Sequence, residues 1–330
     1  MAAYTNILVI QTAFIGDAIL ASSLIEKLRH KFPQAAISVL VRKGNGTIYE
    51  NHPYLKEVLI WDKEHQKIRH LFELLFDIRR KKFDCVISCH RYFSSGLLAG
   101  FSGARHIAGY KQNPLSFLFN FTVAHSIGDG THETERYCRL VSDFAGDETF
   151  RPRLYPSAKD EQAVLRYQEK PYVCLAPASV WFTKQMPVHK WVELCNRLDP
   201  DLNIYLLGSK ADEGLCLQIA GQCPDRKIIS LAGQLSLLQS CALMKGAVMN
   251  FVNDSAPLHL ASSVNAPVRA FFASTVPAFG FGPLSDNSKT YGVDQLPCRP
   301  CGLHGYVACP LGHFKCGNEM PLPLREELRS

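Results

Sequence analysis

The chain has 330 residues, of which 47% are hydrophobic and 20% charged, a composition that is typical of a folded globular protein and excludes a disordered one. It has no apolar stretch near the roughly 18 residues of a membrane span, no signal-peptide pattern at its N-terminus, and no dense basic stripe for nucleic acid. The first two of these absences predict a cytoplasmic protein. The mild charge surplus of +6 favours acidic small molecules or an anionic membrane surface as partners.

The first half of the chain alternates apolar runs with helical patterns. Strands are predicted over 7–11, 37–41, 58–61, 85–88 and 106–110, and helices over 18–31, 66–82, 94–101 and 133–144. Continuous apolar strands separated by helices are typical of a parallel sheet that is covered on both faces. We therefore expect one doubly wound α/β domain over residues 1–155.

A second domain of the same kind is predicted after RPRLYPS, residues 151–157, whose prolines and polar residues indicate a linker. Its strands are predicted over 172–176, 204–207, 228–231, 247–252 and 268–272, and its helices over 189–198, 211–222, 235–245 and just after Asn253. This domain spans 156–330. Such sheets bind ligands at the carboxyl ends of their strands, so we expect the active site in a cleft between the two domains.

The turn TAFIGDAIL, residues 12–20, joins the first strand to the first helix. Only Gly16 of a dinucleotide-binding fingerprint is present, which weakens an oxidoreductase function. Asp17 lies near the start of the helix, where an aspartate is most often an N-cap. A carboxylate at the end of a strand also faces the region where substrates bind, so a general base is the alternative.

The motif NDSAPLH, residues 253–259, follows an apolar strand and opens a short helix. Asp254 or Ser255 can cap this helix, and its first N–H groups together with the helix dipole can hold an anion such as a diphosphate. Capping alone, with His259 a core histidine, is the alternative.

The loop PASVWFTKQMP, residues 177–187, follows the first strand of the second domain. It offers the hydroxyl of Ser179 and the cation of Lys184 at a strand end, which suits a phosphate-bearing donor. An ordinary solvated lysine is the alternative.

Taken in order along the chain, these motifs resemble those of glycosyltransferase family 9, which contains the ADP-heptose:lipopolysaccharide heptosyltransferases. The resemblance spans residues 6–317 and rests on GDAIL after the first strand, the Lys184 loop followed by HKWVEL, LLGSKADE at 206–213, and NDSAPLHLASSVNAPVRAFF at 253–272. The C-terminal CRPCGLHGYVACPLGHFKC is similar to the cysteine-bearing tail of the heptosyltransferase II branch.

The resemblance implies the GT-B fold, in which two Rossmann-like domains face a central cleft, the first binding the acceptor and the second the nucleotide sugar. It also implies an inverting transfer of heptose from ADP-heptose to the inner core of lipopolysaccharide, without a catalytic metal or cofactor. Residue by residue, it places the catalytic acid at Asp17 and the donor site at Ser179, Lys184, Glu213 (or its neighbour Asp212), Asp254, Ser255 and His259. Ala256 replaces the usual glycine and allows a less close approach to phosphate.

Two groups of basic residues in the first domain are candidates for contact with an anionic acceptor or membrane. Arg42 and Arg91 each follow a strand end and are the expected acceptor contacts, although each can equally be a surface charge. The cluster at 79–82 lies late on a helix, where cations complement the dipole. Peripheral contact of this cluster with the inner face of the inner membrane is the alternative.

Four of the twelve cysteines fall within residues 298–316: Cys298, Cys301, Cys309 and Cys316. Their spacing, C-x2-C-x7-C-x6-C, is compatible with a structural zinc or iron, with His304 or His313 as substitute ligands, but also with disulfides or packed thiols. Four thiolates would leave no open position, so such a metal would not be catalytic. The other eight cysteines lie singly in apolar segments and are expected in the core.

Other functions remain compatible with these patterns. A GT-B transferase that uses another nucleotide sugar is the first, a nucleotide-sugar epimerase of the same fold is the second, and a non-catalytic nucleotide-sugar-binding subunit is the third.

Overall fold

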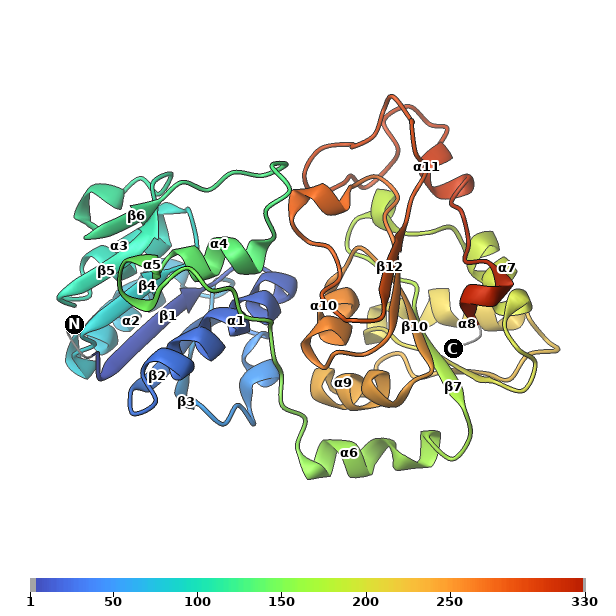
Figure 1. Cartoon of the computed structure of the whole chain (residues 1–330), viewed down its shortest axis with the longest axis horizontal. Coiled ribbons are helices and arrows are strands. Elements are labelled where there is room, and N and C mark those ends of the chain that lie inside the picture. The colour runs from blue at the N-terminus through green and yellow to red at the C-terminus, as the bar shows by residue number, and fades with distance from the viewer. Residues whose placement is uncertain (1–3, 329–330) are drawn as a thin grey trace. The chain divides into compact units, whose positions relative to one another are not determined.

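The computed structural model describes residues 4–328 of the chain. These residues form two compact units, one ending at Tyr155 and one beginning at Pro156, and each unit contains a parallel six-stranded sheet (Figure 1). The outer ends of the predicted domains, residues 1–3 and 329–330, lie outside the described residues. Within 4–328, no helix combines the length and the apolar character that crossing a membrane requires.

Unit 1 has the strand order β3-β2-β1-β4-β5-β6. Its strands are β1 (Asn6–Gln11), β2 (Ala36–Arg42), β3 (Leu55–Trp61), β4 (Cys85–Ser88), β5 (His106–Tyr110) and β6 (Phe121–Val123), and its helices are α1 (Ile15–Lys31), α2 (Lys67–Lys81), α3 (Phe93–Gly100), α4 (Glu133–Arg139) and α5 (Ser142–Ala145). Helices α1, α4 and α5 pack together, and α2 packs on α3 over a core that includes Leu8, Ile10 and Trp61.

Three predictions for unit 1 need correction. The strand β6 was missed because its three residues are only half-buried and carry no apolar run. The predicted helix over 133–144 is two helices, broken at Leu140 and Val141. Helix α1 starts three residues earlier than expected, at Ile15, which changes the position of Asp17 within it.

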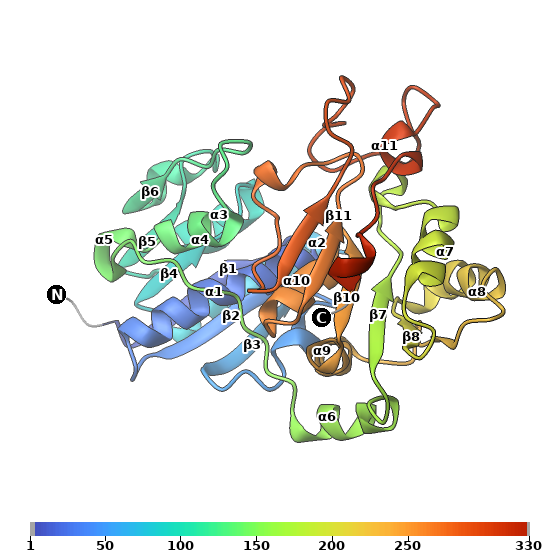
Figure 2. The same cartoon turned by 45° about the vertical axis from the view of Figure 1, so that its right-hand side comes forward.

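Unit 2 repeats the architecture with the order β12-β11-β10-β7-β8-β9. Its strands are β7 (Tyr172–Ala176), β8 (Asn203–Leu206), β9 (Ile228–Ser230), β10 (Met249–Asn253), β11 (Val268–Phe271) and β12 (Ser288–Tyr291), and its helices are α6 (Ala158–Val164), α7 (Val188–Arg197), α8 (Glu213–Gly221), α9 (Leu237–Gly246), α10 (Ala256–Ser263) and α11 (Lys315–Asn318). Helices α7 and α8 lie on one side of the sheet and α9 and α10 on the other (Figure 2).

Three elements of unit 2 were not predicted: β12, α6 and the four-residue helix α11. The strand β12 was missed because its sequence, SKTY, is polar. Helix α6 was missed although it begins with a capping box, in which Ser157 and Asp160 bond to each other's backbone N–H groups. The residues expected to be a linker therefore end in the N-cap of a helix.

Candidate active site

Asp17 lies at the junction of β1 and α1, at the carboxyl edge of the unit 1 sheet. The prediction that it is the N-cap is wrong, because the N-cap is Phe14, which has extended backbone and makes no side-chain cap. Asp17 is the third residue of the helix. A carboxylate in this first turn still benefits from the positive end of the helix dipole.

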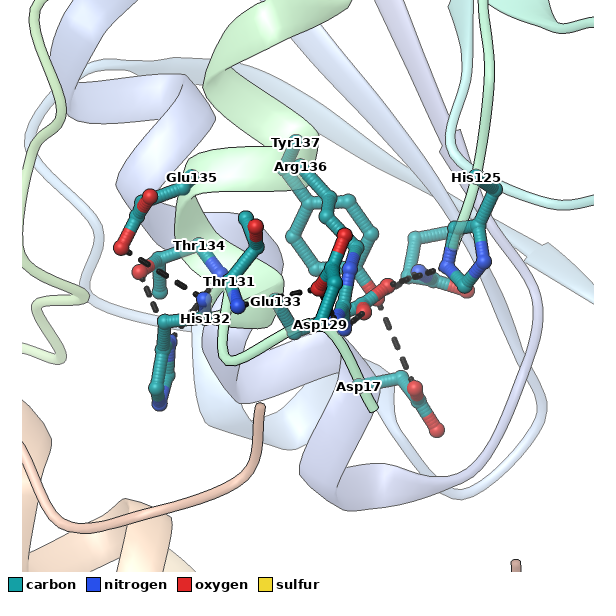
Figure 3. A network of polar contacts seen from close by, with 11 residues as sticks. Asp17, His125, Asp129, Thr131, His132, Glu133, Thr134, Glu135, Arg136 and Tyr137 are labelled. Carbon is teal, nitrogen blue, oxygen red and sulfur yellow. Dashed lines mark hydrogen bonds and ion pairs between the residues drawn. The ribbon is translucent and has the colours of Figure 1, made fainter. Parts of the chain in front are cut away.

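A short chain of buried hydrogen bonds leads to Asp17. The side-chain amide of Gln11 donates to the Tyr137 hydroxyl at 2.8 Å. That hydroxyl donates to Asp17 Oδ1 at 3.5 Å (Figure 3). Gln11 also accepts the N–H of Ala13 at 3.0 Å, which shapes the turn. Gln11 and Tyr137 are about 1% exposed, whereas the Asp17 residue is half-buried, so the chain of bonds runs from the core to Asp17.

The surroundings of Asp17 raise its pKa to about 7. Burial of the carboxyl is the largest cause, because it penalises the charged form, and the negative charge of Glu133 is the second. Backbone N–H groups and Tyr137 oppose the shift. A carboxylate with a pKa near the operating pH is well matched to general base catalysis.

Glu133, the first residue of α4, is buried in a charged network. It accepts hydrogen bonds from His125 Nε2 at 3.3 Å and from Arg136 at 2.8 Å, and Arg136 reaches Asp129 at 3.2 Å (Figure 3). Burial alone would raise the pKa of Glu133, but the bonds and charges of His125 and Arg136 outweigh it and lower that pKa. Glu133 is therefore ionised when Asp17 titrates.

The two cations expected to meet an acceptor, Arg42 and Arg91, differ in their surroundings. Arg42 forms an ion pair with Glu64 at 3.1 Å. Arg91 is half-buried and makes no hydrogen bond or ion pair with any residue in 4–328. The pKa of His90 is lowered to about 4, first by burial, then by the charge of Lys63 and then by that of Arg91. The charge of Arg91 is therefore felt at the carboxyl end of β4.

Lys63 is a cation of the same edge that sequence reasoning missed. It donates to the carbonyl of Thr12 at 2.5 Å and lies over the Trp61 ring at 4.6 Å. Burial, followed by the charges of Arg42 and Lys67, lowers its pKa to about 8. Lys63 follows the end of β3 by two residues, and this position at a strand end could have marked it as a candidate.

In unit 2, Asn253 fixes the loop that carries the expected donor residues. Its side chain accepts from the N–H of Met186 at 3.0 Å and donates to the carbonyl of Pro177 at 2.7 Å, so it fastens both ends of the loop. This is possible because β10 pairs directly with β7. The asparagine at the head of the NDSAPLH motif therefore has a structural role that the sequence did not reveal.

Lys184 and Asp254 are brought together at the end of this loop. Lys184 Nζ lies 2.7 Å from Asp254 Oδ2, and Thr275 donates to the same oxygen at 2.5 Å. The prediction that Asp254 caps α10 is therefore wrong. Ser255 does occupy the N-cap position, but its hydroxyl makes no cap bond, and Ala256 opens the helix.

The remaining predicted donor residues lie at neighbouring strand ends. Ser179 accepts from Gln185 through its carbonyl at 2.6 Å, while its hydroxyl has no hydrogen-bond partner in the described chain. Glu213 starts α8 and pairs with Lys210 at 2.6 Å. Asp212 accepts from the N–H and hydroxyl of Ser209, at 2.8 and 2.7 Å, so both acids are engaged by neighbours in the chain.

His259 lies one turn into α10 and is 4% exposed, next to the ring of Phe281 with 6.3 Å between ring centroids. His259 is therefore a buried residue of the first turns of α10, as the core-histidine alternative expects.

The C-terminal tail packs against the Lys184 loop. Thr183 exchanges hydrogen bonds with the backbone of Tyr306 at 3.1 and 2.8 Å. Gly305, at φ +79°, lets the tail approach closely, because a Cβ there would lie 3.0 Å from Lys184 Cγ. The Arg299 guanidinium donates to four backbone carbonyls around the end of β11, which anchors the tail.

The cysteine quartet lies in this tail. All twelve cysteines are free thiols, so the disulfide alternative is wrong, and the eight outside the quartet are buried as expected. Cys298 Sγ is 3.9 Å from His313 Nε2, and Cys301 donates to the Cys298 carbonyl. The pKa of Cys316 is raised to about 11, mainly by burial and then by the charges of the three other thiols of the quartet. The four thiols therefore lie near one another. As they lie, no three metal-ligating groups within 4–328 are placed around one ion.

The comparisons agree with this architecture. The family model "Glycosyltransferase family 9 (heptosyltransferase)" matches residues 71–306. The chain is 24% identical over 303 residues to lipopolysaccharide heptosyltransferase 2 of Escherichia coli K12, covering 86% of this chain and 87% of the relative.

Two solved structures show the same fold. That of Escherichia coli ADP-heptose lipopolysaccharide heptosyltransferase II has a TM-score of 0.76 at 22% identity and covers 96% of this chain and 98% of its own. The dodecameric iron-containing heptosyltransferase TibC of enterotoxigenic Escherichia coli has a TM-score of 0.59 at 13% identity and covers 97% of this chain and 73% of its own.

The two parallel sheets with their helices thus form the GT-B fold expected from the sequence. The family match covers well over half of the chain and includes the Lys184 loop and the NDSAPLH motif. The chain therefore belongs to glycosyltransferase family 9, the heptosyltransferases.

Proposed function

We propose that the chain transfers heptose from ADP-heptose to the inner core of lipopolysaccharide, with inversion and without a catalytic metal. The observation that carries this proposal is Asp17, a half-buried carboxylate with a pKa of about 7 at a strand end. As the acceptor hydroxyl oxygen bonds to the anomeric carbon, Asp17 takes its proton, and the bond from that carbon to the diphosphate oxygen breaks.

Unit 2 holds the groups suited to the departing ADP. The ammonium of Lys184 and the N-terminus of α10 offer positive charge to the diphosphate, the Ser179 hydroxyl a hydrogen bond, and the Glu213 carboxylate an acceptor for the ribose hydroxyls. The anionic acceptor would meet Arg91 and Lys63 in unit 1. No second carboxylate is needed for a single displacement.

The test is incubation with ADP-heptose and a heptose-deficient lipopolysaccharide, followed by mass spectrometry. We expect the acceptor to gain one heptose. A gain with another nucleotide sugar but none with ADP-heptose would overturn the donor assignment, and conversion of the donor without any acceptor would indicate an epimerase.

Glu133→Gln should move the acidic limb of the kcat/KM pH profile to lower pH, by about one unit. Removing the negative charge beside Asp17 favours its ionised form, so its pKa falls and activity persists in more acidic buffer. Glu73→Gln, which removes an exposed carboxylate on α2, is the matched control and should leave the midpoint near pH 7. An unmoved midpoint in Glu133→Gln would contradict the coupling.

We propose further that the cysteine quartet holds a structural zinc or iron. The C-x2-C-x7-C-x6-C spacing supports this, as does the effect of the three other thiols on the pKa of Cys316. Metal analysis of protein purified without chelator should find one ion per chain, lost in a Cys301→Ser, Cys316→Ser variant. Because the tail packs on the Lys184 loop, loss of the metal should also weaken ADP binding.

Helix α2 is the surface that we propose for peripheral contact with the inner membrane. Ile68, Phe72 and Phe76 recur every four residues along it and are 72%, 46% and 69% exposed. Its opposite face packs on the core through Leu74 and Ile78. An exposed apolar stripe on a helix with a basic last turn is typical of a helix that lies on an anionic bilayer.

Vesicle co-sedimentation tests this surface. The chain should bind phosphatidylglycerol vesicles and not phosphatidylcholine vesicles, and Phe72→Ser with Phe76→Ser should abolish binding. Phe117→Ser, which removes an equally exposed phenylalanine elsewhere in unit 1, is the control. Equal binding of both variants would exclude α2 as the contact.

A further inference from the structure

Unit 1 contains a pocket of about 370 Å³ that none of the roles above uses. It is lined by Glu26, Arg29, His30, Tyr54, Thr149, Phe150, Arg151 and Arg153. These residues come from the last turns of α1, from the residue before β3, and from the stretch after α5. Arg29 follows Asp17 by twelve residues along α1, which is about 18 Å of helix, so the pocket is separate from the catalytic turn.

The pocket brings three arginines, Arg29, Arg151 and Arg153, together with one carboxylate, Glu26, on whose pKa the charge of Arg153 acts. The guanidinium groups of Arg29 and Arg153 form no ion pair or hydrogen bond with any residue in 4–328. Arg29 instead lies over the Tyr54 ring at 5.2 Å. The dipole at the end of α1 favours a cation at Arg29, whereas Arg151 and Arg153 come from the segment after α5.

A single carboxylate accompanies these arginines. Glu26 is held by the Tyr155 hydroxyl at 2.8 Å, with His52 Nε2 at 3.6 Å. This carboxylate disfavours a bare anion but can accept hydrogen bonds from hydroxyl groups. Tyr54 and Phe150 add flat aromatic surface, the latter packed against His30 with 5.3 Å between ring centroids.

We propose that this pocket binds a sugar phosphate, with the arginines on the phosphate, Glu26 on the sugar hydroxyls, and Tyr54 and Phe150 against the ring. Guanidinium groups pair with phosphate in a bidentate manner, and the volume lies in the range of small-molecule sites. The proposal does not depend on the transferase function, because it concerns another part of unit 1.

Calorimetric titration of the full chain with glucose 6-phosphate, inorganic phosphate and glucose tests this site. Glucose 6-phosphate should bind at least about tenfold more tightly than inorganic phosphate, and glucose should not bind detectably. Arg153→Gln and Arg29→Gln should each weaken glucose 6-phosphate binding about tenfold. Arg80→Gln, an exposed arginine on α2, is the control and should change nothing.

Glu26→Gln separates a sugar phosphate from an anion. It should weaken glucose 6-phosphate binding and leave inorganic phosphate binding unchanged or tighter, since a negative charge is removed. Three outcomes would overturn the proposal. Glucose 6-phosphate and inorganic phosphate could bind equally well, Glu26→Gln could weaken both equally, or neither could bind.

A second titration distinguishes the source of the phosphate. A free sugar phosphate and a phosphorylated sugar of the acceptor glycolipid present the same chemistry. Competition between glucose 6-phosphate and a deacylated, phosphorylated core oligosaccharide decides between them. Displacement by the oligosaccharide with higher affinity assigns the glycolipid, and weaker displacement assigns a free metabolite.

Discussion

Asp17→Asn is expected to reduce kcat for sugar transfer by about 1,000-fold, because the amide cannot accept the proton of the acceptor hydroxyl. ADP affinity should be unchanged, since the groups that we propose for the donor lie in unit 2. Steady-state kinetics with calorimetric ADP binding measures both. Glu73→Gln, an exposed carboxylate of the same unit, should retain full activity. Turnover within a few-fold of the wild type would contradict the role of Asp17 as base.

Asp17→Asn is also expected to change the pH dependence of stability. The folded-state pKa of Asp17, about 7, lies above its ordinary value of 3.8, so the folded chain binds the proton more tightly than the unfolded chain. The stabilisation from this proton is complete below pH 3.8 and is lost as the pH rises through 7. Asp17→Asn should therefore have an equal or higher Tm, with an advantage that grows between these pH values. A loss of about 1 kcal/mol with turnover retained would instead indicate that Asp17 serves only to stabilise the first turn of α1.

Lys184→Met is expected to weaken ADP binding about 100-fold, because a charge-assisted contact to a phosphate is lost. It should also cost about 2 kcal/mol of stability, since Asp254 is left buried without its cation. The double variant Lys184→Met, Asp254→Asn should recover stability but not ADP affinity. Recovery of stability without recovery of ADP affinity would show that Lys184 binds ADP. Recovery of both would show that Lys184 only neutralises Asp254.

Lys190→Met provides the matched control for this experiment. Lys190 has the same exposed fraction as Lys184, 16%, and pairs with Glu193 at 2.9 Å on α7. Its loss should leave ADP affinity unchanged. Similar effects of both lysine variants on ADP binding would mean that Lys184 has no specific role in the donor site.

The sequence predicted the two doubly wound units because their strands are apolar runs with helices between them. It also singled out the turn of Asp17 and the loop of Lys184, since both stand at strand ends. It did not reveal the roles of Gln11 and Tyr137, because Tyr137 contacts both Gln11 and Asp17 across more than a hundred positions in the chain. Tyr137 reads as an ordinary core aromatic of a helix.

The N-cap position was predicted wrongly for Asp17, and at α10 it is held by Ser255, the alternative to Asp254, for a related reason. Asp17 and Asp254 both stand near a helix start, where local preference favours a cap. In the structure each carboxylate is engaged by a residue from elsewhere: Tyr137 for Asp17, and Lys184 with Thr275 for Asp254. Tertiary contacts set the role of these acids, and local propensity does not encode them.

The configuration of the new glycosidic bond tests the central claim most directly. A single base at Asp17 implies one displacement at the anomeric carbon. The NMR coupling constants of the product should therefore show the configuration opposite to that of the donor sugar, and Asp17→Asn should yield no product on the same timescale. Product with the donor's configuration retained would contradict a single displacement and the role of Asp17 with it.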